Sequence, residues 1–582
     1  MPESTPCYFS SASIHMIFRG RAFPWIGLAV ILICFVISIL REHPTNYFGL
    51  TGDDAVYFSS AKALAQGQGY VLPNLPGAPP ATKYPILYSW LLSWAWRVNG
   101  SFPANLREAT AITVVFGLGF ITLALVFLRR LAGIGNAESL FITAFCALHP
   151  RVIFFSGAVM SDIPFAALAL AAMLAADRAM HPQTKDTIAF SSGILAGLAM
   201  LMRLSGVAVV AGILVMAIAW RAWRQLLVFC GSMVPFFAWI MWQQLELSKS
   251  RVAALSGSSL GWTRMWTYYT SYVEFWRISV PDKSVFWAML TNNLTQIVFG
   301  TSDYFLSPLL VKNTFPSRAL SAMVTAAIVA GLVRHAHREE WKVIHYVAPF
   351  YVAVIVLWNY PITERNFILF LPLFSAGLWI EGKHLLGMLR AAFAGAVSPA
   401  EKVLAASIAV AVVALSGGMA WNYLTGARTV IARTGAYRVA LRDEKREAYD
   451  WISHFTPSSA RIIAYEDASA YLYTGRLAMP PVVFTTAELY EPARLEQTMD
   501  HITDVARAIG AAYWIVSADD FDLESSTARQ KAGDRVAELG RTWPLAFRSR
   551  GGHVSIYSLE CLNDPNGAGC QPADRNIFPA AP

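Results

Sequence analysis

Long apolar segments, separated by short loops that contain Arg and Lys, dominate the first 423 residues of this 582-residue chain. A helix that crosses the roughly 30 Å hydrocarbon core of a membrane needs about 20 mostly apolar residues. Eleven segments approach that length, and we predict a membrane-spanning helix at each of them. They are residues 24–40, 109–128, 137–155, 161–177, 188–202, 204–220, 225–242, 318–333, 343–358, 366–380 and 403–421. The first is followed by Arg41 and Glu42 rather than by a small-residue cleavage site, so we interpret it as an anchor and not as a removed signal peptide.

Charged residues divide the chain into two parts. Residues 424–582 contain 17 Lys and Arg and 20 Asp and Glu, which leaves 29 and 18 of the totals of 46 and 38 for residues 1–423. The second part therefore has the charge density of a soluble domain, whereas charge is sparse in the first part. Because the net charge of +8 arises in the apolar part, it is explained by membrane orientation, and nucleic-acid binding is excluded.

Basic residues cluster in alternate loops, and Lys and Arg are enriched in the loops that stay in the cytoplasm. The clusters are Arg19/Arg21, Arg129/Arg130, Arg178/Lys185, Arg221/Arg224, Arg334/Arg338/Lys342 and Lys383/Arg390/Lys402. With eleven spans, this pattern predicts a cytoplasmic N-terminus and an extracytoplasmic C-terminal domain. Residues 41–108, 156–162 and 243–317 then form outer segments. The Trp and Tyr residues of the last of these favour a helix on the membrane surface over direct ligand contact.

We therefore predict an α-helical polytopic membrane protein of about eleven spans with a small α/β domain outside the membrane. Residues 1–423 form the membrane domain, and residues 424–561 the α/β domain, in which helical and strand patterns alternate. The helices are expected at 443–455, 468–473 and 495–509, and the strands at 461–465, 512–516 and 554–558. Residues 562–582 are expected to be a disordered tail. Cys561 and Cys570 would be able to form a disulfide in an oxidising compartment.

Three carboxylates in the outer segments are candidates for chemistry. Asp53 and Asp54 follow the first span directly, next to an apolar environment that tends to raise the pKa of a carboxyl group. Such a group suits a general base that works near neutral pH. Asp162 precedes Pro164 and an apolar helix that begins on the same side of the membrane. In each case the alternative role is helix capping, for which Asp is a favoured residue.

Three cations on the predicted outer face are candidates for holding a phosphate group. Lys83 precedes a possible re-entrant apolar segment, and its alternative is to extend toward lipid headgroups. The same alternative applies to Arg203, between two spans. For Arg365 the alternative is an ion pair with its neighbour Glu364.

These residues resemble motifs of the GT-C glycosyltransferases, nearest to the family 39-like group of protein O-mannosyltransferases and aminoarabinose-lipid A transferases. Gly52–Tyr57, followed by Gly67 and Gly69-Tyr70, resembles the first outer loop of that family. Lys83–Leu87 resembles the Lys-Pro-Pro-Leu segment, Asp162 its second acidic site and Thr363–Leu373 its late Arg-Tyr and Pro segment. The sequence departs from the pattern in Asp54, where Glu is usual, Tyr84, where Pro is frequent, and Asn366, where Tyr is frequent.

The resemblance implies transfer of a sugar from a polyprenyl-phosphate donor, outside the membrane, by a single inverting displacement. It implies that Asp53 is the base for the acceptor hydroxyl and that Lys83, with Arg365, holds the lipid phosphate. Asp162 would orient the acceptor or support Asp53. A lipid, glycan or protein acceptor fits equally, as does a divalent metal ion shared by two acids. A bacterial inner membrane is favoured.

A transporter or lipid flippase is the main alternative, and a non-catalytic scaffold the second. Transporters frequently contain internal halves of matching hydropathy and place their charges near the bilayer midplane. The sequence shows no such halves, and its candidate charges lie at one face. A scaffold leaves the grouping of Asp53, Lys83 and Asp162 without an explanation.

Overall fold

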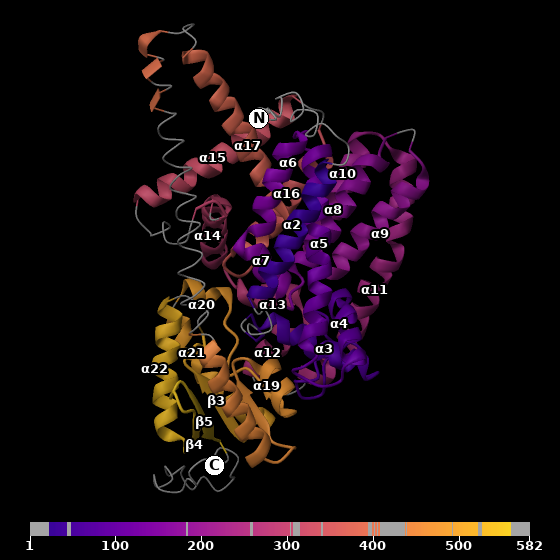
Figure 1. Ribbon diagram of the computed structural model, residues 1–582. Helices are drawn as coiled ribbons and strands as arrows, with labels where there is room; N and C mark the ends of the chain where they lie inside the picture. The colour runs from indigo at the N-terminus through magenta and orange to yellow at the C-terminus, as the bar shows by residue number, and fades with distance from the viewer. Residues whose placement is uncertain are drawn as a thin grey trace, which may run out of the picture.

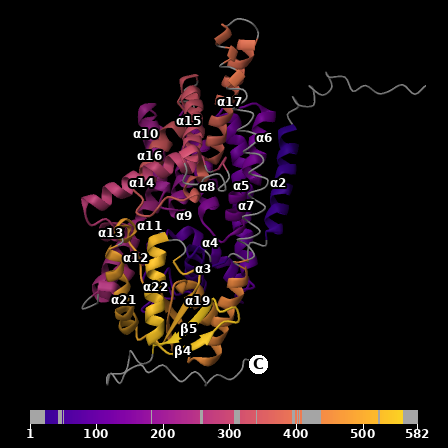
Figure 2. The same ribbon diagram turned by 90° about the vertical axis from the view of Figure 1, so that its left-hand side faces the viewer.

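The computed structural model describes residues 23–559, with gaps at 43–47, 50, 182–183, 256–259, 303, 307–314, 339–340, 394–397, 401, 404–405, 408–436, 438, 492 and 522–525. A bundle of helices forms one part of the molecule and a small α/β domain lies at one end of it (Figure 1). The view in Figure 2 shows the same order of the two parts after a 90° turn. The predicted fold class is confirmed at this level. The predicted tail and the pair Cys561 and Cys570 fall outside the described residues.

Apolar helices build the bundle because a helix pairs its backbone polar groups within one segment, as the interior of a membrane requires. They are α2 (Phe23–Arg41), α5 (Leu106–Arg130), α6 (Asn136–Leu148), α7 (Pro150–Gly157), α8 (Asp162–Ala179), α9 (Asp186–Met202), α10 (Gly206–Ala219), α11 (Trp223–Leu255), α15 (Phe315–Arg338), α16 (Val343–Val356) and α17 (Leu371–Phe393). Helices occupy ten of the eleven predicted spans. The eleventh, at 403–421, lies almost wholly outside the described residues.

Four of the described helices are long and apolar enough to cross a membrane on their own. These segments are Phe23–Arg41, Leu106–Arg130, Trp223–Lys249 and Arg318–His337. The helices α6 and α7, which meet at a 58° bend before Pro150, form a fifth if they are counted as one broken span. The chain is thus an integral membrane protein, and the number of eleven spans stays a prediction.

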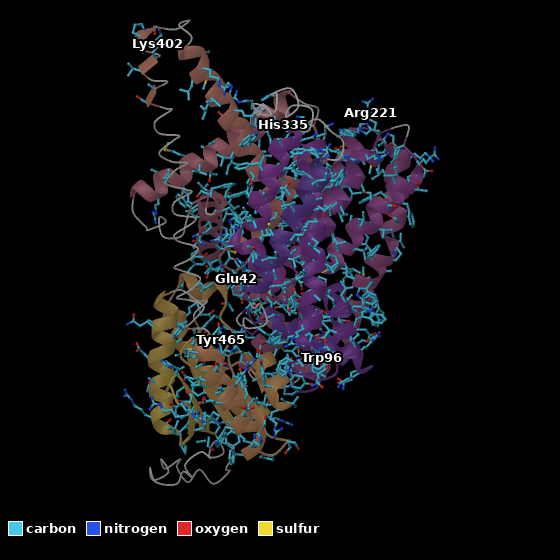
Figure 3. The ribbon with its side chains drawn as sticks, viewed as in Figure 1. Glu42, Trp96, Arg221, His335, Lys402 and Tyr465 are labelled. Carbon is cyan, nitrogen blue, oxygen red and sulfur yellow. The ribbon has the colours of Figure 1, made fainter. Side chains whose placement is uncertain are left out.

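Loops that share a predicted side of the membrane also share an end of the bundle. Figure 3 shows Arg221 and His335 at the end far from Trp96 and from Tyr465 of the α/β domain. Ion pairs connect the predicted cytoplasmic loops to one another at that end. They join Arg224 to Asp186 at 2.6 Å and Lys383 to Glu138 at 2.9 Å.

Further helices, most of them short, lie toward the other end of the bundle, beside the α/β domain. They are α3 (Asp53–Ala65), α4 (Ile86–Val98), α12 (Leu260–Thr270), α13 (Tyr272–Ser279), α14 (Lys283–Ser302) and the 3-10 helix η2 (Glu364–Phe370). Glycine allows the chain to enter and leave α3. Gly52, directly before the helix, has φ +69°, and Gly67 and Gly69 after it have φ +75° and +85°. These are left-handed conformations that a side chain would strain.

The α/β domain contains one five-stranded sheet in the order β2-β1-β3-β5-β4. Its strands are β1 (Arg461–Ala464), β2 (Leu477–Met479), β3 (Tyr513–Ser517), β4 (Leu545–Arg548) and β5 (Val554–Ser558), and its helices are a helix over 439–455, α19 (Asp467–Thr474), α20 (Thr486–Tyr490), α21 (Ala493–Ile509) and α22 (Ser526–Thr542). The first three strands are parallel, and β5 is antiparallel to β3 and β4. All six predicted elements are present. The sequence analysis did not predict β2, β4, α20 and α22.

One helix of the aromatic outer segment is covered by protein. This helix, α12, packs against α21 of the α/β domain, and Trp266 and Tyr269 are buried. Arg264 of α12 donates to Glu488 at 2.7 Å. For α12 the expected exposure to lipid headgroups is therefore not met, because a domain far along the chain covers it. For α13 and α14, where Val273 and Trp287 are exposed, a position on the membrane surface stays a prediction.

Candidate active site

Asp53 is held by two side chains that come from different parts of the chain. The Arg365 guanidinium, in η2, donates to its Oδ2 at 2.8 Å, and the Tyr84 hydroxyl donates to its Oδ1 at 2.7 Å. The side chain of Asp53 is 18% exposed and that of Arg365 27% exposed, so the pair is partly open to solvent. Arg365 therefore pairs with Asp53; the side chain of its predicted alternative partner, Glu364, lies outside the described residues.

The two adjacent carboxylates have opposite electrostatic environments. Burial raises the pKa of Asp53, but Arg365, the Tyr84 hydroxyl and Lys83 outweigh it and bring that pKa below the usual value. Burial raises the pKa of Asp54 to about 7. The expected raised pKa is therefore confirmed for Asp54 and wrong for Asp53, because the sequence did not reveal the cations that face Asp53.

Asp54 is turned toward the backbone and away from the solvent. Its Oδ2 accepts from the Gly49 amide and its Oδ1 from the Ala55 amide, each at 2.8 Å. Neither Asp53 nor Asp54 is the N-cap of α3, which is Gly52. The contacts of Asp54 thus hold the turn that presents Asp53.

Lys83 is buried among aromatic rings at the start of the segment leading into α4. Its ammonium group lies 3.3 Å from the ring centroid of Tyr268, with the rings of Tyr84 and Tyr272 at 5.3 and 5.6 Å. Burial lowers the pKa of Lys83 to about 7, although Asp53 acts in the opposite direction. Lys83 is thus a cation held among three aromatic rings. An anion that binds beside it would stabilise its charged form.

Asp162 is paired with the second arginine of the site. Asp162 is the first residue of α8 and follows the N-cap residue Ser161. Arg203 donates to its Oδ1 at 3.0 Å. Arg203 also donates to the Ser161 hydroxyl at 3.2 Å, and that hydroxyl is 2.9 Å from the hydroxyl of Tyr57 in α3. The second oxygen of Asp162, Oδ2, is buried and has no hydrogen-bond partner among the described residues. Arg203 therefore faces the protein rather than lipid headgroups.

The structure thus brings together five of the six candidate residues, Asp53, Lys83, Asp162, Arg203 and Arg365. Asp53 contacts Arg365, while Lys83 and Arg203 are close enough to lower the pKa of Asp53. Asp162 joins the group through Arg203. Asp54 supports the same turn but faces the backbone.

The sequence analysis missed Tyr84, Tyr268 and Tyr272 as members of the site. Tyr84 was visible only as a departure from a family pattern. The two other tyrosines lie about 185 residues further along the chain, and no local spacing relates them to Lys83.

The described residues contain no group of three or more His, Cys, Asp and Glu side chains that would hold a metal ion. In this part of the chain Asp53 and Asp162 each face an arginine, which takes the place that a cation would occupy.

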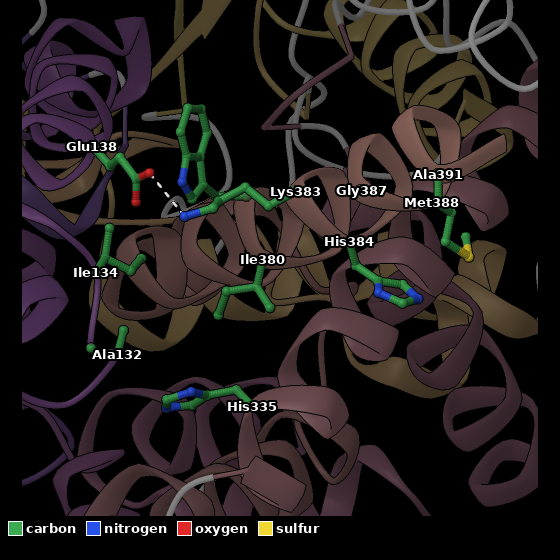
Figure 4. Close-up of a pocket in the computed structure, with 12 residues that line it drawn as sticks. Ala132, Ile134, Glu138, His335, Ile380, Lys383, His384, Gly387, Met388 and Ala391 are labelled. Atoms are coloured by element: carbon green, nitrogen blue, oxygen red, sulfur yellow. Dashed lines mark hydrogen bonds and ion pairs between the residues drawn. The ribbon is translucent and has the colours of Figure 1, made fainter. Parts of the chain in front are cut away.

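A separate cavity of about 630 Å³ lies at the opposite end of the bundle, between α6, α15 and α17. Figure 4 shows His335, His384 and Lys383 along it, with Lys383 paired to Glu138. None of the predicted site residues lines this cavity.

Comparisons with known proteins rest on structure alone, because no family model and no curated protein matches the sequence. ArnT from Cupriavidus metallidurans, solved with undecaprenyl phosphate, matches 93% of this chain and 99% of its own length, with a TM-score of 0.50 and 14% identity. The chain has the GT-C fold. The GT-C fold is what the motif resemblance implied, so that expectation is confirmed.

Two further solved structures match at lower similarity. The oligosaccharyltransferase AglB from Archaeoglobus fulgidus, in complex with an inhibitory peptide and a dolichol-phosphate, matches 92% of this chain and 74% of its own, with a TM-score of 0.46 and 12% identity. The arabinofuranosyltransferase AftD from Mycobacteria matches 93% and 41%, with a TM-score of 0.39 and 15% identity. Assignment of the GT-C fold rests on ArnT and not on these two.

Proposed function

We propose that this protein is a membrane glycosyltransferase that transfers a sugar from a polyprenyl-phosphate donor to a hydroxyl or phosphate acceptor. The observation that carries the proposal is the grouping of a carboxylate, Asp53, with Lys83, Arg365 and Arg203 at one end of a GT-C bundle. A fold hosts many functions, so the argument rests on these side chains. They combine a base with several cations, as transfer from a phosphate leaving group requires.

In the proposed reaction the acceptor hydroxyl attacks the anomeric carbon of the donor sugar in one step. Asp53 takes the proton of that hydroxyl as the new carbon–oxygen bond forms and the bond to the lipid phosphate breaks. The configuration at the anomeric carbon inverts. Lys83 and Arg365 stabilise the negative charge that develops on the departing phosphate, which is the type of electrostatic stabilisation that contributes most to many enzymes.

Asp162 and Asp54 have supporting roles in this proposal. The unpartnered Oδ2 of Asp162 would accept a hydrogen bond from the acceptor, while Arg203 holds its other oxygen. Asp54 keeps the turn before α3 in place through the Gly49 amide. No step of the scheme needs a metal ion, since arginine and lysine face the positions where charge develops.

The donor chemistry also agrees with a location at the membrane. A polyprenyl chain brings its sugar within the bilayer plane, and the site lies at the end of the bundle covered by the α/β domain (Figure 1). We propose that this end is extracytoplasmic, that the N-terminus is cytoplasmic, and that the membrane is a bacterial inner membrane. The basic loops at the opposite end support this orientation.

Transport is not favoured by this arrangement. The charged groups of a transporter lie near the bilayer midplane between repeated halves, whereas Asp53, Lys83 and Asp162 lie in or beside segments that close one end of the bundle.

A donor panel tests the proposal. The purified full chain in lipid nanodiscs is offered polyprenyl-phosphate sugars, together with lipid, glycan and peptide acceptors, and release of polyprenyl phosphate is measured. We expect turnover of at least one donor. Movement of a fluorescent polyprenyl lipid across a liposome membrane, with no sugar released from any donor, would overturn the proposal in favour of transport.

A further inference from the structure

The carboxylate that must accept a proton is already engaged on both of its oxygens. Arg365 occupies Oδ2 and the Tyr84 hydroxyl occupies Oδ1. A general base needs a free lone pair and a pKa close to the working pH. Asp53 keeps a free lone pair on each oxygen, but its pKa is too low for this role, because the Arg365 ion pair, the Tyr84 hydrogen bond and the nearby charges stabilise the ionised form.

Two arginine–carboxylate pairs lie in the site, and they differ in how open they are. Arg203 is 17% exposed and its partner Asp162 is 2% exposed, and Arg203 makes a second hydrogen bond to Ser161. Arg365 is 27% exposed, its partner Asp53 is 18% exposed, and within the described residues Asp53 is its one hydrogen-bond acceptor. The Arg365 pair is therefore the one that an incoming anion can open.

A phosphate is a strong competitor for that guanidinium. Arginine binds phosphate through two parallel hydrogen bonds, while Asp53 receives a single one, from Nη1. Lys83, held on the Tyr268 ring, adds a second positive charge for the same anion. The Tyr84 hydroxyl would remain on Oδ1 and keep the carboxylate in position after Oδ2 is released.

We propose that Arg365 is shared between the base and the donor: the lipid phosphate takes Arg365 from Asp53, and only then is Oδ2 basic enough to accept the acceptor proton. This inference rests on the proposed function and adds to it an order of events. Asp53 and the donor phosphate compete for one guanidinium, so the base becomes competent when the leaving group is in place. Tyr84 acts as a positioning residue throughout.

The competition has a consequence for binding that does not depend on turnover. Removing the charge of Asp53 frees Arg365, so Asp53→Asn should bind undecaprenyl phosphate about 10-fold more tightly than the wild type, within the usual range of coupling energies. The same substitution in an Arg365→Gln background should give no gain. Asp186→Asn is the matched control, because it makes the same substitution in an arginine pair at the opposite end of the bundle, and it should change the affinity less than twofold.

The experiment measures the affinity of the full chain in nanodiscs for undecaprenyl phosphate. Five proteins are compared: the wild type, Asp53→Asn, Arg365→Gln, the double variant with both substitutions, and the control variant. A gain in Asp53→Asn that disappears with Arg365→Gln supports the competition. An equal gain in both backgrounds would show repulsion between Asp53 and the phosphate without a shared arginine, and overturns the inference. Unchanged or weaker binding of Asp53→Asn overturns it as well. Absence of binding by the wild type contradicts the proposed function itself, so the two failures are distinguishable.

Discussion

The two ends of the helical bundle use charge in different ways. At the end beside the α/β domain, Lys83, Asp162 and Asp54 are buried, and Asp53 is largely covered. At the opposite end the pairs of Arg224 with Asp186 and of Lys383 with Glu138 are exposed or partly exposed, and two carboxylates, Asp177 and Glu381, are buried. The first end therefore buries a lysine close to a carboxylate, whereas the ion pairs at the other end keep their basic partner partly or fully exposed.

This difference separates two roles that look similar in the sequence. Exposed basic loops orient helices in a membrane through their number and side, with little demand on geometry. Burying a charged side chain at the edge of a membrane costs free energy, so such residues are usually found where they have a function. The cavity between α6, α15 and α17 belongs to the first kind of region, since its lysine is exposed and already paired with Glu138.

The largest expected effect is the difference in catalytic rate between loss of a carboxylate at the active end and loss of one at the opposite end. Asp53→Asn should lower kcat/KM for donor and acceptor by about 1000-fold, because general base catalysis contributes roughly 100- to 10,000-fold. Asp186→Asn, which breaks the exposed pair at the opposite end, should leave the rate within twofold. Initial rates of lipid phosphate release, with melting curves to verify folding, measure both. Equal losses in the two variants would contradict the comparison.

The second effect concerns Lys83, whose pKa burial lowers to about 7. Its ammonium form is present below that pH and is lost as the pH rises through it, so donor affinity should fall above pH 7 by up to about tenfold per unit. Lys83→Arg keeps its charge at every pH and should bind with no such fall, whereas Lys83→Ala should bind weakly throughout. Affinity for undecaprenyl phosphate between pH 6 and pH 9 is the measurement. A wild-type affinity that is constant over this range would argue against Lys83 as a phosphate ligand.

A third effect concerns the contact between the α/β domain and the outer segments. Asp467 accepts hydrogen bonds from Asn74 at 2.7 Å and from Tyr269 at 2.8 Å, and burial raises its pKa to about 7. In the unfolded chain the pKa of Asp is near 4, so its contribution to stability is complete below about pH 4 and is lost as the pH rises through about 7.

The melting temperature of the wild type should therefore fall between pH 5 and pH 8, and in Asp467→Asn this fall should be smaller by a few degrees. Each kcal/mol of unfolding free energy corresponds to about 2–4 °C. Asn cannot ionise, while its amide oxygen still accepts from Asn74 and Tyr269. Asp443→Asn, which removes an exposed carboxylate paired with Arg442, is the control and should leave the slope unchanged. An identical pH slope in Asp467→Asn and the wild type would show that this carboxyl group is not responsible.

The smallest effect is expected at the exposed pair of Lys383 with Glu138. Exposed ion pairs contribute roughly 0–1 kcal/mol to stability, so Lys383→Ala should change the melting temperature by less than about 2 °C and leave donor turnover unaltered. A loss of turnover would mean that the cavity beside it takes part in function.

The sequence predicted the helices of the bundle well because each depends on local apolar length. It also indicated Asp53, Lys83, Asp162 and Arg365 through motifs. It did not indicate that Arg365 faces Asp53 across 312 residues, because an ion pair between distant segments has no local signature. For the same reason the pKa of Asp53 was predicted in the wrong direction.

The α/β domain shows the same limit. Its longer elements, such as β3 and α21, were visible as periodic patterns, whereas the three-residue strand β2 was too short to leave one. The role of Asp467 in joining Asn74 to Tyr269 depends on three separate segments. Elements were therefore predictable and the contacts between them were not.

Photo-cross-linking of the donor tests most directly the claim that the buried charges form the active end of the bundle. A photoactivatable undecaprenyl-phosphate sugar is cross-linked to the full chain in nanodiscs, and the modified peptides are identified by mass spectrometry. The account predicts modification around Lys83, Tyr268 and Arg365, suppressed by unlabelled undecaprenyl phosphate. Modification confined to 379–391, at the opposite end, would contradict it.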